Sequence, residues 1–151
     1  MKKKLIALIS FLCYIICWVQ AADEHYYFKN LSIQDGLSQT TVNAIIQDKK
    51  GFMWFGTKGG LNRYDGMLFR NFKHDMTDNH SLGNNFVTCL YQDNNGNIWV
   101  GTDAGVYIYY SDQEIFIPFD RLSRENTKIE RTVSAISGDK QGRVWIAVET
   151  Q

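Results

Sequence analysis

The stretch QDNNGNIWVGTDAG, residues 92–105, concentrates aspartate, asparagine, glycine and one tryptophan within a short span. Its side-chain oxygens could ligate a cation, and its glycines could surround a phosphate, but neither motif fits. An EF-hand loop has its invariant glycine at the sixth position, whereas Gly96 follows Asp93 by only three residues. A P-loop requires G-x-x-x-x-G-K-[ST], and this stretch lacks both that spacing and the lysine. The stretch therefore carries no recognised ion or phosphate motif.

The same letters recur at a nearly constant interval along the chain. Residues 47–60 read QDKKGFMWFGTKGG, and residues 138–148 read GDKQGRVWIAV. The repeated positions are Asp48, Gly51, Trp54 and Gly56 in the first copy, Asp93, Gly96, Trp99 and Gly101 in the second, and Asp139, Gly142 and Trp145 in the third. Self-similarity at a fixed period indicates a repeat architecture, so the motif is predicted to build structure rather than to bind a ligand.

Each copy predicts four short strands separated by turns. The first strand, at 42–47, 87–92 and 133–138, alternates apolar positions around a small central residue. A D-x-x-G turn follows, in which the aspartate caps the turn and the glycine takes a positive φ. The second strand carries the tryptophan, and a glycine-containing loop leads to the third.

The fourth strand ends in an F-x-x-F pair, which is Phe69/Phe72 in the first copy and Phe116/Phe119 in the second. Between the first and second copies, this pair is shifted along the sequence by two residues more than the other repeated positions are. The shift predicts a turn between the third and fourth strands that is two residues longer in the second copy.

Four strands in about 45 residues is the period of a β-propeller blade. A helical repeat of this length is disfavoured by the frequent glycines and the strand-like alternation. The predicted fold is all-β, with blades of four antiparallel strands in an incomplete ring of about two and a half blades. The predicted units are a signal peptide (1–21), a lead-in strand region (22–41), a first blade (42–86), a second blade (87–132) and a truncated third blade (133–151).

The N-terminus has the composition of a secretory signal. Three lysines precede an apolar run from Leu5 to Val19, and Ala21 provides a small residue at the expected cleavage point. The apolar run is short for a membrane span, so we expect cleavage after Ala21. The mature chain would then enter the periplasm.

Cleavage changes both the charge and the cysteine content. Sixteen basic residues balance sixteen acidic ones in the whole chain, and loss of the three N-terminal lysines leaves three more acids than bases. No basic face for nucleic acid is indicated. Cys13 and Cys17 are removed, so Cys89 remains alone and is predicted to be a buried, inert thiol.

Longer motifs carry a family resemblance. The segments GLSQTTVNAIIQDKKGFMWFGTKGGLNRYDGMLFRNF and SLGNNFVTCLYQDNNGNIWVGTDAGVYIY resemble the two-component regulator propeller repeat, in its N-terminal position in bacterial hybrid two-component sensors. The motifs DGLS (35–38), D-x-x-G-x-x-W-x-G-T and GLNRYDG carry the resemblance. The third copy departs from it, since Ala147 and Val148 replace Gly-Thr.

The resemblance implies a periplasmic propeller region that recognises glycan-derived ligands, followed in a complete protein by a membrane span, a histidine kinase, a receiver and a helix-turn-helix module. The expected partners are an oligosaccharide ligand and either the remaining propeller blades or a homodimer partner. We interpret the chain as an N-terminal fragment or a prematurely ended gene product. The alternative is a stand-alone secreted or periplasmic propeller that scaffolds protein contacts.

Catalytic and metal-binding functions find little support in the residue pattern. The repeated aspartates are explained by their turns, and the three histidines lack partners at metal-ligand spacing. The repeated tryptophans could stack on a sugar, but their regular recurrence favours packing between blades. We expect no enzyme activity, no metal and no cofactor for this chain.

Specificity is expected in the segments that do not repeat. Residues 73–85 and 120–132 link the blades on the same face as the loops TKGG and TDAG. For a charged oligosaccharide on that face, the candidate ligand-binding residues are Lys58, His74, Asp103 and Arg121.

Overall fold

The computed structural model describes residues 26–123 and 127–150 of the chain. It divides into two units after Asn30. Residues 26–30 of the first unit are exposed and have no regular secondary structure. The predicted signal peptide, residues 1–21, lies outside the described residues.

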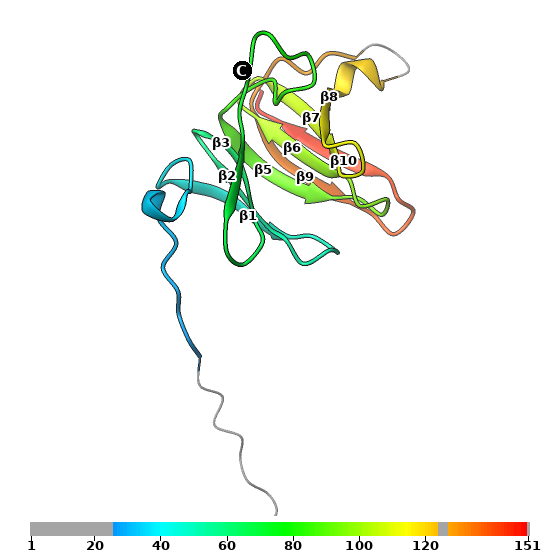
Figure 1. Cartoon of the computed structure of the whole chain (residues 1–151). Helices are drawn as coiled ribbons and strands as arrows, with labels where there is room; N and C mark the ends of the chain where they lie inside the picture. The colour runs from blue at the N-terminus through cyan, green and yellow to red at the C-terminus, as the bar shows by residue number, and fades with distance from the viewer. Residues whose placement is uncertain (1–25, 124–126, 151) are drawn as a thin grey trace, which may run out of the picture. The chain divides into compact units, whose positions relative to one another are not determined.

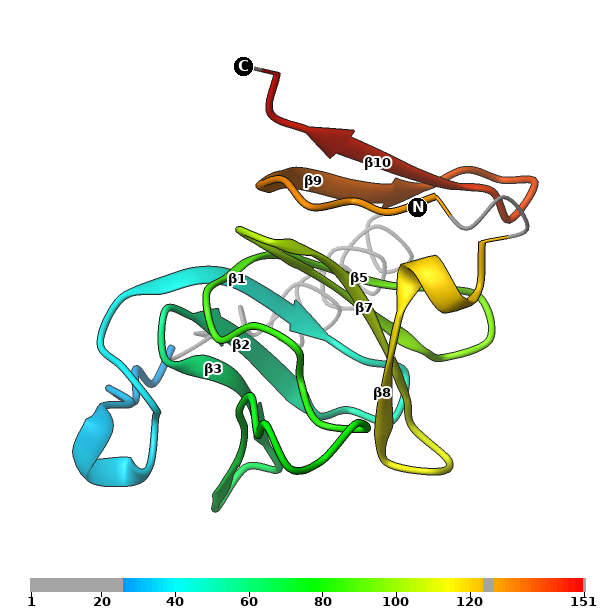
Figure 2. The ribbon, with the colours of Figure 1, turned by 90° about the horizontal axis from the view of Figure 1, so that it is seen from above.

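The second unit consists of three antiparallel sheets. The first sheet has the order β1 (Val42–Gln47), β2 (Met53–Thr57), β3 (Gly60–Tyr64) and β4 (Phe69–Phe72), the second has the order β5 (Val87–Gln92), β6 (Ile98–Thr102), β7 (Gly105–Tyr110) and β8 (Ile115–Pro118), and the third pairs β9 (Val133–Gly138) with β10 (Val144–Val148). Strands other than β4 are labelled in Figure 1, and the view from above in Figure 2 shows the sheets following one another in chain order. The prediction of all-β, four-stranded antiparallel blades is confirmed.

The repeated motif forms a clip between the first two strands of each blade. In the first blade, Asp48 Oδ1 accepts hydrogen bonds from the backbone N–H groups of Lys50 and Phe52, each at 2.9 Å. Asp48 Oδ2 accepts a hydrogen bond from Trp54 Nε1 at 2.7 Å. Gly51 takes a φ of 91°, a conformation that glycine adopts without steric cost. One carboxylate thus holds both the turn and the tryptophan that follows it.

The other two copies repeat these contacts. The indole N–H of Trp99 donates to Asp93 Oδ2 at 3.0 Å, and that of Trp145 donates to Asp139 Oδ2 at 3.1 Å. The Oδ1 atoms of both aspartates accept two backbone N–H groups each, from Asn95, Asn97, Gln141 and Arg143. These carboxylates are therefore committed to the turns.

Adjacent blades meet where the repeat has a glycine in its second strand. A Cβ added to Gly56 would lie 2.5 Å from Cγ1 of Val87, which begins the first strand of the next blade. A Cβ added to Gly101 would lie 3.0 Å from Cγ1 of Val133. Both valines are fully buried. Glycine is required here because the neighbouring strand approaches so closely.

The three repeated tryptophans differ in burial. Trp54 is 1% exposed and packs edge-to-face against Tyr109 of the second blade, with ring centroids 5.1 Å apart. Trp99 is half-buried, and its ring centroid lies 6.0 Å from that of Phe119. Trp145 is 60% exposed, unlike the predicted packing between blades. The cause is that the described residues place no further sheet against this face of β9–β10.

Two local predictions differ from the structure. The β3–β4 and β7–β8 turns, residues 65–68 and 111–114, have equal lengths. The two additional residues of the second blade extend its hairpin by the pair Tyr110 and Ile115 instead, and Phe119 lies beyond β8. In the described part of the lead-in region, a 3-10 turn over Ile33–Asp35 takes the place of the expected strand.

Candidate functional site

The strand order places two sets of connections at opposite ends of the blades. The link face is formed by residues 58–59, 103–104 and the interblade links 73–86 and 119–132, of which 124–126 are not described. The turn face is formed by residues 48–52, 65–68, 93–97, 111–114 and 139–143. All four predicted ligand-binding residues lie on the link face, and all four are exposed.

Three of these predicted residues gather around the segment that leads into β5. Lys58 Nζ lies 4.9 Å from the centroid of the Phe86 ring. The Asp103 N–H donates to the Phe86 carbonyl at 3.2 Å, and the His74 N–H donates to Asn85 Oδ1 at 2.7 Å. The structure therefore brings Lys58, His74 and Asp103 to one part of the link face.

The fourth predicted residue, Arg121, belongs to a second 3-10 turn, η2 (Phe119–Arg121). Its neighbour Asp120 is the more informative side chain. Asp120 Oδ1 is buried and has no hydrogen-bond partner among residues 26–123 and 127–150. A buried acceptor without a donor costs about 1–3 kcal/mol, so this oxygen is a point at which a ligand would gain free energy.

A pocket of about 180 Å³ opens beside Asp120. It lies between the start of β7, the end of β8 and the link segment 128–130. Its lining includes the aromatic residues Tyr107 and Phe119, together with Gly105 and its neighbours at the start of β7. At the same pocket, Lys128 pairs with Glu130 at 3.8 Å, and both side chains are largely exposed. The pocket is small, partly aromatic and acidic.

Nearby carboxylates make the surroundings of the Tyr107 hydroxyl group electrostatically negative. Its side chain is half-buried, and burial raises the pKa of the Tyr107 hydroxyl. The carboxylates of Asp120 and Asp103 raise this pKa further, because they disfavour a second negative charge nearby. The predicted residue Asp103 and the unpredicted residue Asp120 thus act on the same hydroxyl group.

Tyr107 and Asp120 were not among the predicted site residues, although a signal for Tyr107 exists in the repeat. In the first blade, Ser38 N–H donates to Asn62 Oδ1 at 2.8 Å. One repeat later, Gly83 and Tyr107 stand at these positions, and a Cβ on Gly83 would lie 2.1 Å from the Tyr107 ring. The paired change from Ser and Asn to Gly and Tyr makes space for a large ring on the link face of the second blade.

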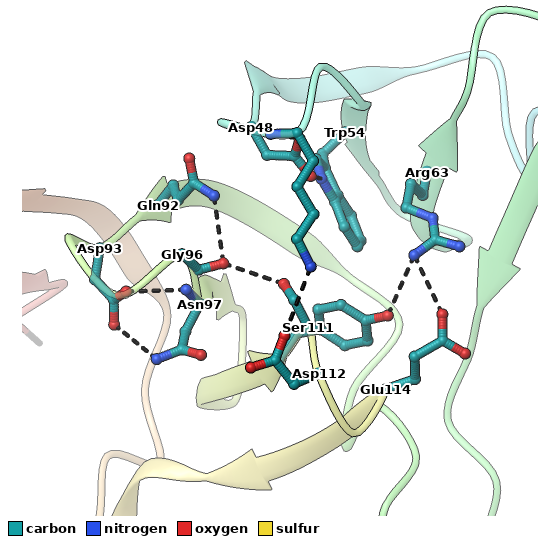
Figure 3. A network of polar contacts seen from close by, with 12 residues as sticks. Asp48, Trp54, Arg63, Gln92, Asp93, Gly96, Asn97, Ser111, Asp112 and Glu114 are labelled. Atoms are coloured by element: carbon teal, nitrogen blue, oxygen red, sulfur yellow. Dashed lines mark hydrogen bonds and ion pairs between the residues drawn. The ribbon is translucent and has the colours of Figure 1, made fainter.

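The turn face carries a polar network that joins the first two blades. Glu114 accepts from Arg70 at 2.6 Å and from Arg63 at 3.3 Å, and Figure 3 shows the Arg63 contact. These arginines hold the pKa of Glu114 below its ordinary value. Glu114 has a φ of 56°, a left-handed conformation that is uncommon for a non-glycine residue. The network stabilises contact between the blades.

A second hollow, of about 200 Å³, lies on the turn face beside the Asp93 turn. Lys49 Nζ at its edge donates to the Asn94 carbonyl at 2.9 Å. Ser111 Oγ and Gln92 Nε2 both donate to the Gly96 carbonyl, at 3.1 and 3.3 Å, as Figure 3 shows. The polar groups around this hollow are largely engaged with one another, whereas Asp120 Oδ1 is buried and unpartnered among the described residues.

The described part of the chain carries neither a cluster of metal ligands nor a membrane-spanning helix. Across residues 26–123 and 127–150, no group of three or more His, Cys, Asp or Glu residues could hold a metal ion. Within the same residues, no helix has the length and apolar character needed to cross a membrane.

Comparison with known families identifies the repeat. The model of the two-component regulator propeller matches residues 36–59 and 81–104. These segments contain the first two copies of the Asp–Trp clip up to the loops that open the third strands, and the first match begins with Gly36 of the DGLS motif.

The chain is also similar to two known proteins from two-component systems or histidine kinases. Histidine kinase P4 from Formosa agariphila is 38% identical over 77 residues, which are 51% of this chain and 5% of that protein. A solved structure, the extracellular domain of a hybrid two-component system from B. thetaiotaomicron, is similar with a TM-score of 0.69 and 30% identity. The match covers 78% of this chain and 17% of that one. The chain thus spans a small part of the length of each.

Proposed function

We propose that the chain forms part of the extracellular sensing region of a hybrid two-component regulator. The match of residues 36–59 and 81–104 to the two-component regulator propeller model supports this proposal. The observation that carries this proposal is the likeness to the extracellular domain of such a system over 78% of the chain. The relative named as a histidine kinase points in the same direction.

The proposed location is the periplasm, on the outer side of the inner membrane. The N-terminal sequence with the character of a secretory signal and the extracellular location of the structural relative support this location. The kinase and output modules of such a regulator would lie in other parts of the complete protein.

The proposed ligand is an oligosaccharide, recognised on the link face. This face carries the segments that differ between blades, while the clip aspartates of the turn face are committed to their turns. Lys58, Asp103 and the pocket beside Asp120 provide charged and aromatic groups of the kind that orient a small polar ligand. The proposed role is ligand sensing, with no catalytic step in this chain.

Deletion and complementation of the gene test the proposal. Transcripts would be measured during growth on individual polysaccharides, with the deletion strain complemented by the wild type, by Asp103→Asn on the link face, or by Asp112→Asn as a turn-face control. We expect the deletion to abolish induction by at least one polysaccharide, Asp103→Asn to weaken that induction, and Asp112→Asn to restore it. Identical transcripts with and without the gene on every polysaccharide would contradict the sensor and favour the scaffold alternative.

A further inference from the structure

The pocket beside Asp120 has the chemistry of a site for a positively charged group. We propose that it binds the protonated amine of a small ligand, which, given the proposed glycan-sensing function on which this identification rests, is the ammonium group of an amino sugar. An unpartnered hydrogen-bond acceptor, a net negative charge among the described lining residues and an aromatic wall favour this ligand.

The unpartnered acceptor sets the first requirement on the ligand. An ionised carboxylate accepts hydrogen bonds and donates none, so Asp120 Oδ1 requires an N–H or O–H group. Among the described residues, no group forms a hydrogen bond with this buried oxygen. A ligand that places a donor in the pocket would satisfy it and recover the free energy of the missing hydrogen bond.

The charge around the pocket distinguishes an ammonium group from a hydroxyl group. Among the described residues that line the pocket, Asp120 and Glu130 are acidic and Lys128 is basic. Asp103 lies outside the lining, but its charge also acts on the Tyr107 hydroxyl. The lysine at the pocket, Lys128, is paired with Glu130 and contributes no net positive charge with it. Arg121 follows Asp120 in the chain, and its side chain is exposed. The pocket therefore favours a cation over a neutral donor.

The aromatic wall adds a second preference for a cation. Tyr107 and Phe119 line the pocket, and Phe119 is held in place by contact with the Trp99 ring at 6.0 Å. A cation over an aromatic face is attracted by the negative charge of the ring face. The volume of about 180 Å³ is below that of a typical drug-sized site, which limits the ligand to a small group such as one sugar ring.

Three probes of similar shape separate charge from shape. Glucosamine carries the ammonium group, N-acetylglucosamine replaces it with a neutral amide, and glucose replaces it with a hydroxyl. Binding to the purified chain would be followed by amide NMR titration near neutral pH. We expect glucosamine to shift the resonances of Gly105, Tyr107 and Ile129, and to bind at least about tenfold more tightly than either neutral sugar.

Matched variants locate the charge that is responsible. Asp120→Asn preserves the side-chain shape and should weaken glucosamine binding by about tenfold or more. Asp112→Asn removes an exposed carboxylate of the turn face and should leave binding unchanged. The dispersion of each amide spectrum reports whether the variant is folded, and Glu130→Gln provides a second charge variant at the pocket if Asp120→Asn unfolds.

The outcomes separate this inference from the proposed function. Equal binding of glucose and glucosamine at the pocket would overturn the amine specificity and leave sugar sensing in place. Glucosamine binding that is insensitive to Asp120→Asn, or to Glu130→Gln where Asp120→Asn unfolds, would also overturn the inference. Absence of all three sugars from the pocket would refute the site itself, while the transcription experiment would still decide the sensor function.

Discussion

Replacement of Trp54 by alanine should destabilise the chain severely. Trp54 is 1% exposed, stacks on Phe72 with centroids 5.8 Å apart, and packs edge-to-face on Tyr109 of the next blade. The substitution also removes the indole donor to Asp48 Oδ2, which lies at 2.7 Å. Truncation of a buried tryptophan costs about 3–5 kcal/mol, and these contacts place Trp54 at the upper end of that range.

The matched control is Trp145→Ala, at the same repeat position. Trp145 makes the same hydrogen bond to its own aspartate but is 60% exposed, so we expect a loss of about 1 kcal/mol. Urea unfolding followed by far-UV circular dichroism would measure both losses without relying on tryptophan fluorescence. Equal losses for the two variants would refute the inference that Trp54 acts by packing between blades.

Three further predictions follow from single residues. Gly56→Ala should lower the free energy of unfolding in urea by about 1–3 kcal/mol, because the added Cβ meets Val87 of the next blade. The control Ala147→Gly, on the exposed face of β10, should lower it less. Comparable losses would contradict the close approach of the blades. The pKa of Glu114 is lowered, chiefly by the hydrogen bond from Arg70. At pH values above the ordinary pKa of 4.5, the Glu114 carboxylate therefore stabilises the fold, and this stabilisation is lost as the pH falls through the lowered pKa. Glu114→Gln should therefore be less stable than the wild type at neutral pH and converge with it on acidification, and a constant difference in thermal midpoint would contradict this. Burial raises the pKa of the Cys89 thiol. At neutral pH, iodoacetamide should therefore alkylate Cys89 in the folded chain at a rate at least about tenfold below the rate in urea. Equal rates would contradict the prediction.

The blades could be predicted from the sequence because their signals are local. The alternation in the first strands, the positive φ of Gly51 and the position of Asp48 before its turn are all properties of neighbouring residues. The first strands of the three blades have the bounds that the pattern predicts. The extra β7–β8 pair, Tyr110 and Ile115, was not predicted. Two additional residues in a hairpin can lengthen either its turn or its paired strands, and the sequence pattern does not distinguish the two.

The candidate site was predictable only in part, because it depends on segments distant in the sequence. The link face and its exposed residues Lys58 and Asp103 could be located from the strand order alone. The pocket requires β7, β8 and the link segment 128–130 to meet, and no periodicity encodes that approach. That the buried Asp120 Oδ1 has no partner among the described residues likewise becomes apparent only when its surroundings are known. The repeat pattern therefore predicts architecture better than it predicts recognition.

The central claim is that the repeated Asp–Trp motif builds the blades while the link face recognises the ligand. Hydrogen–deuterium exchange of the protein in the presence and absence of its inducing polysaccharide fragment tests this claim most directly. The account predicts added protection in the link-face segments 57–60, 73–86, 102–105 and 119–132, with the clip turns 48–52 and 93–97 unchanged. Ligand-dependent protection confined to the clip turns, with the link face unaffected, would contradict it.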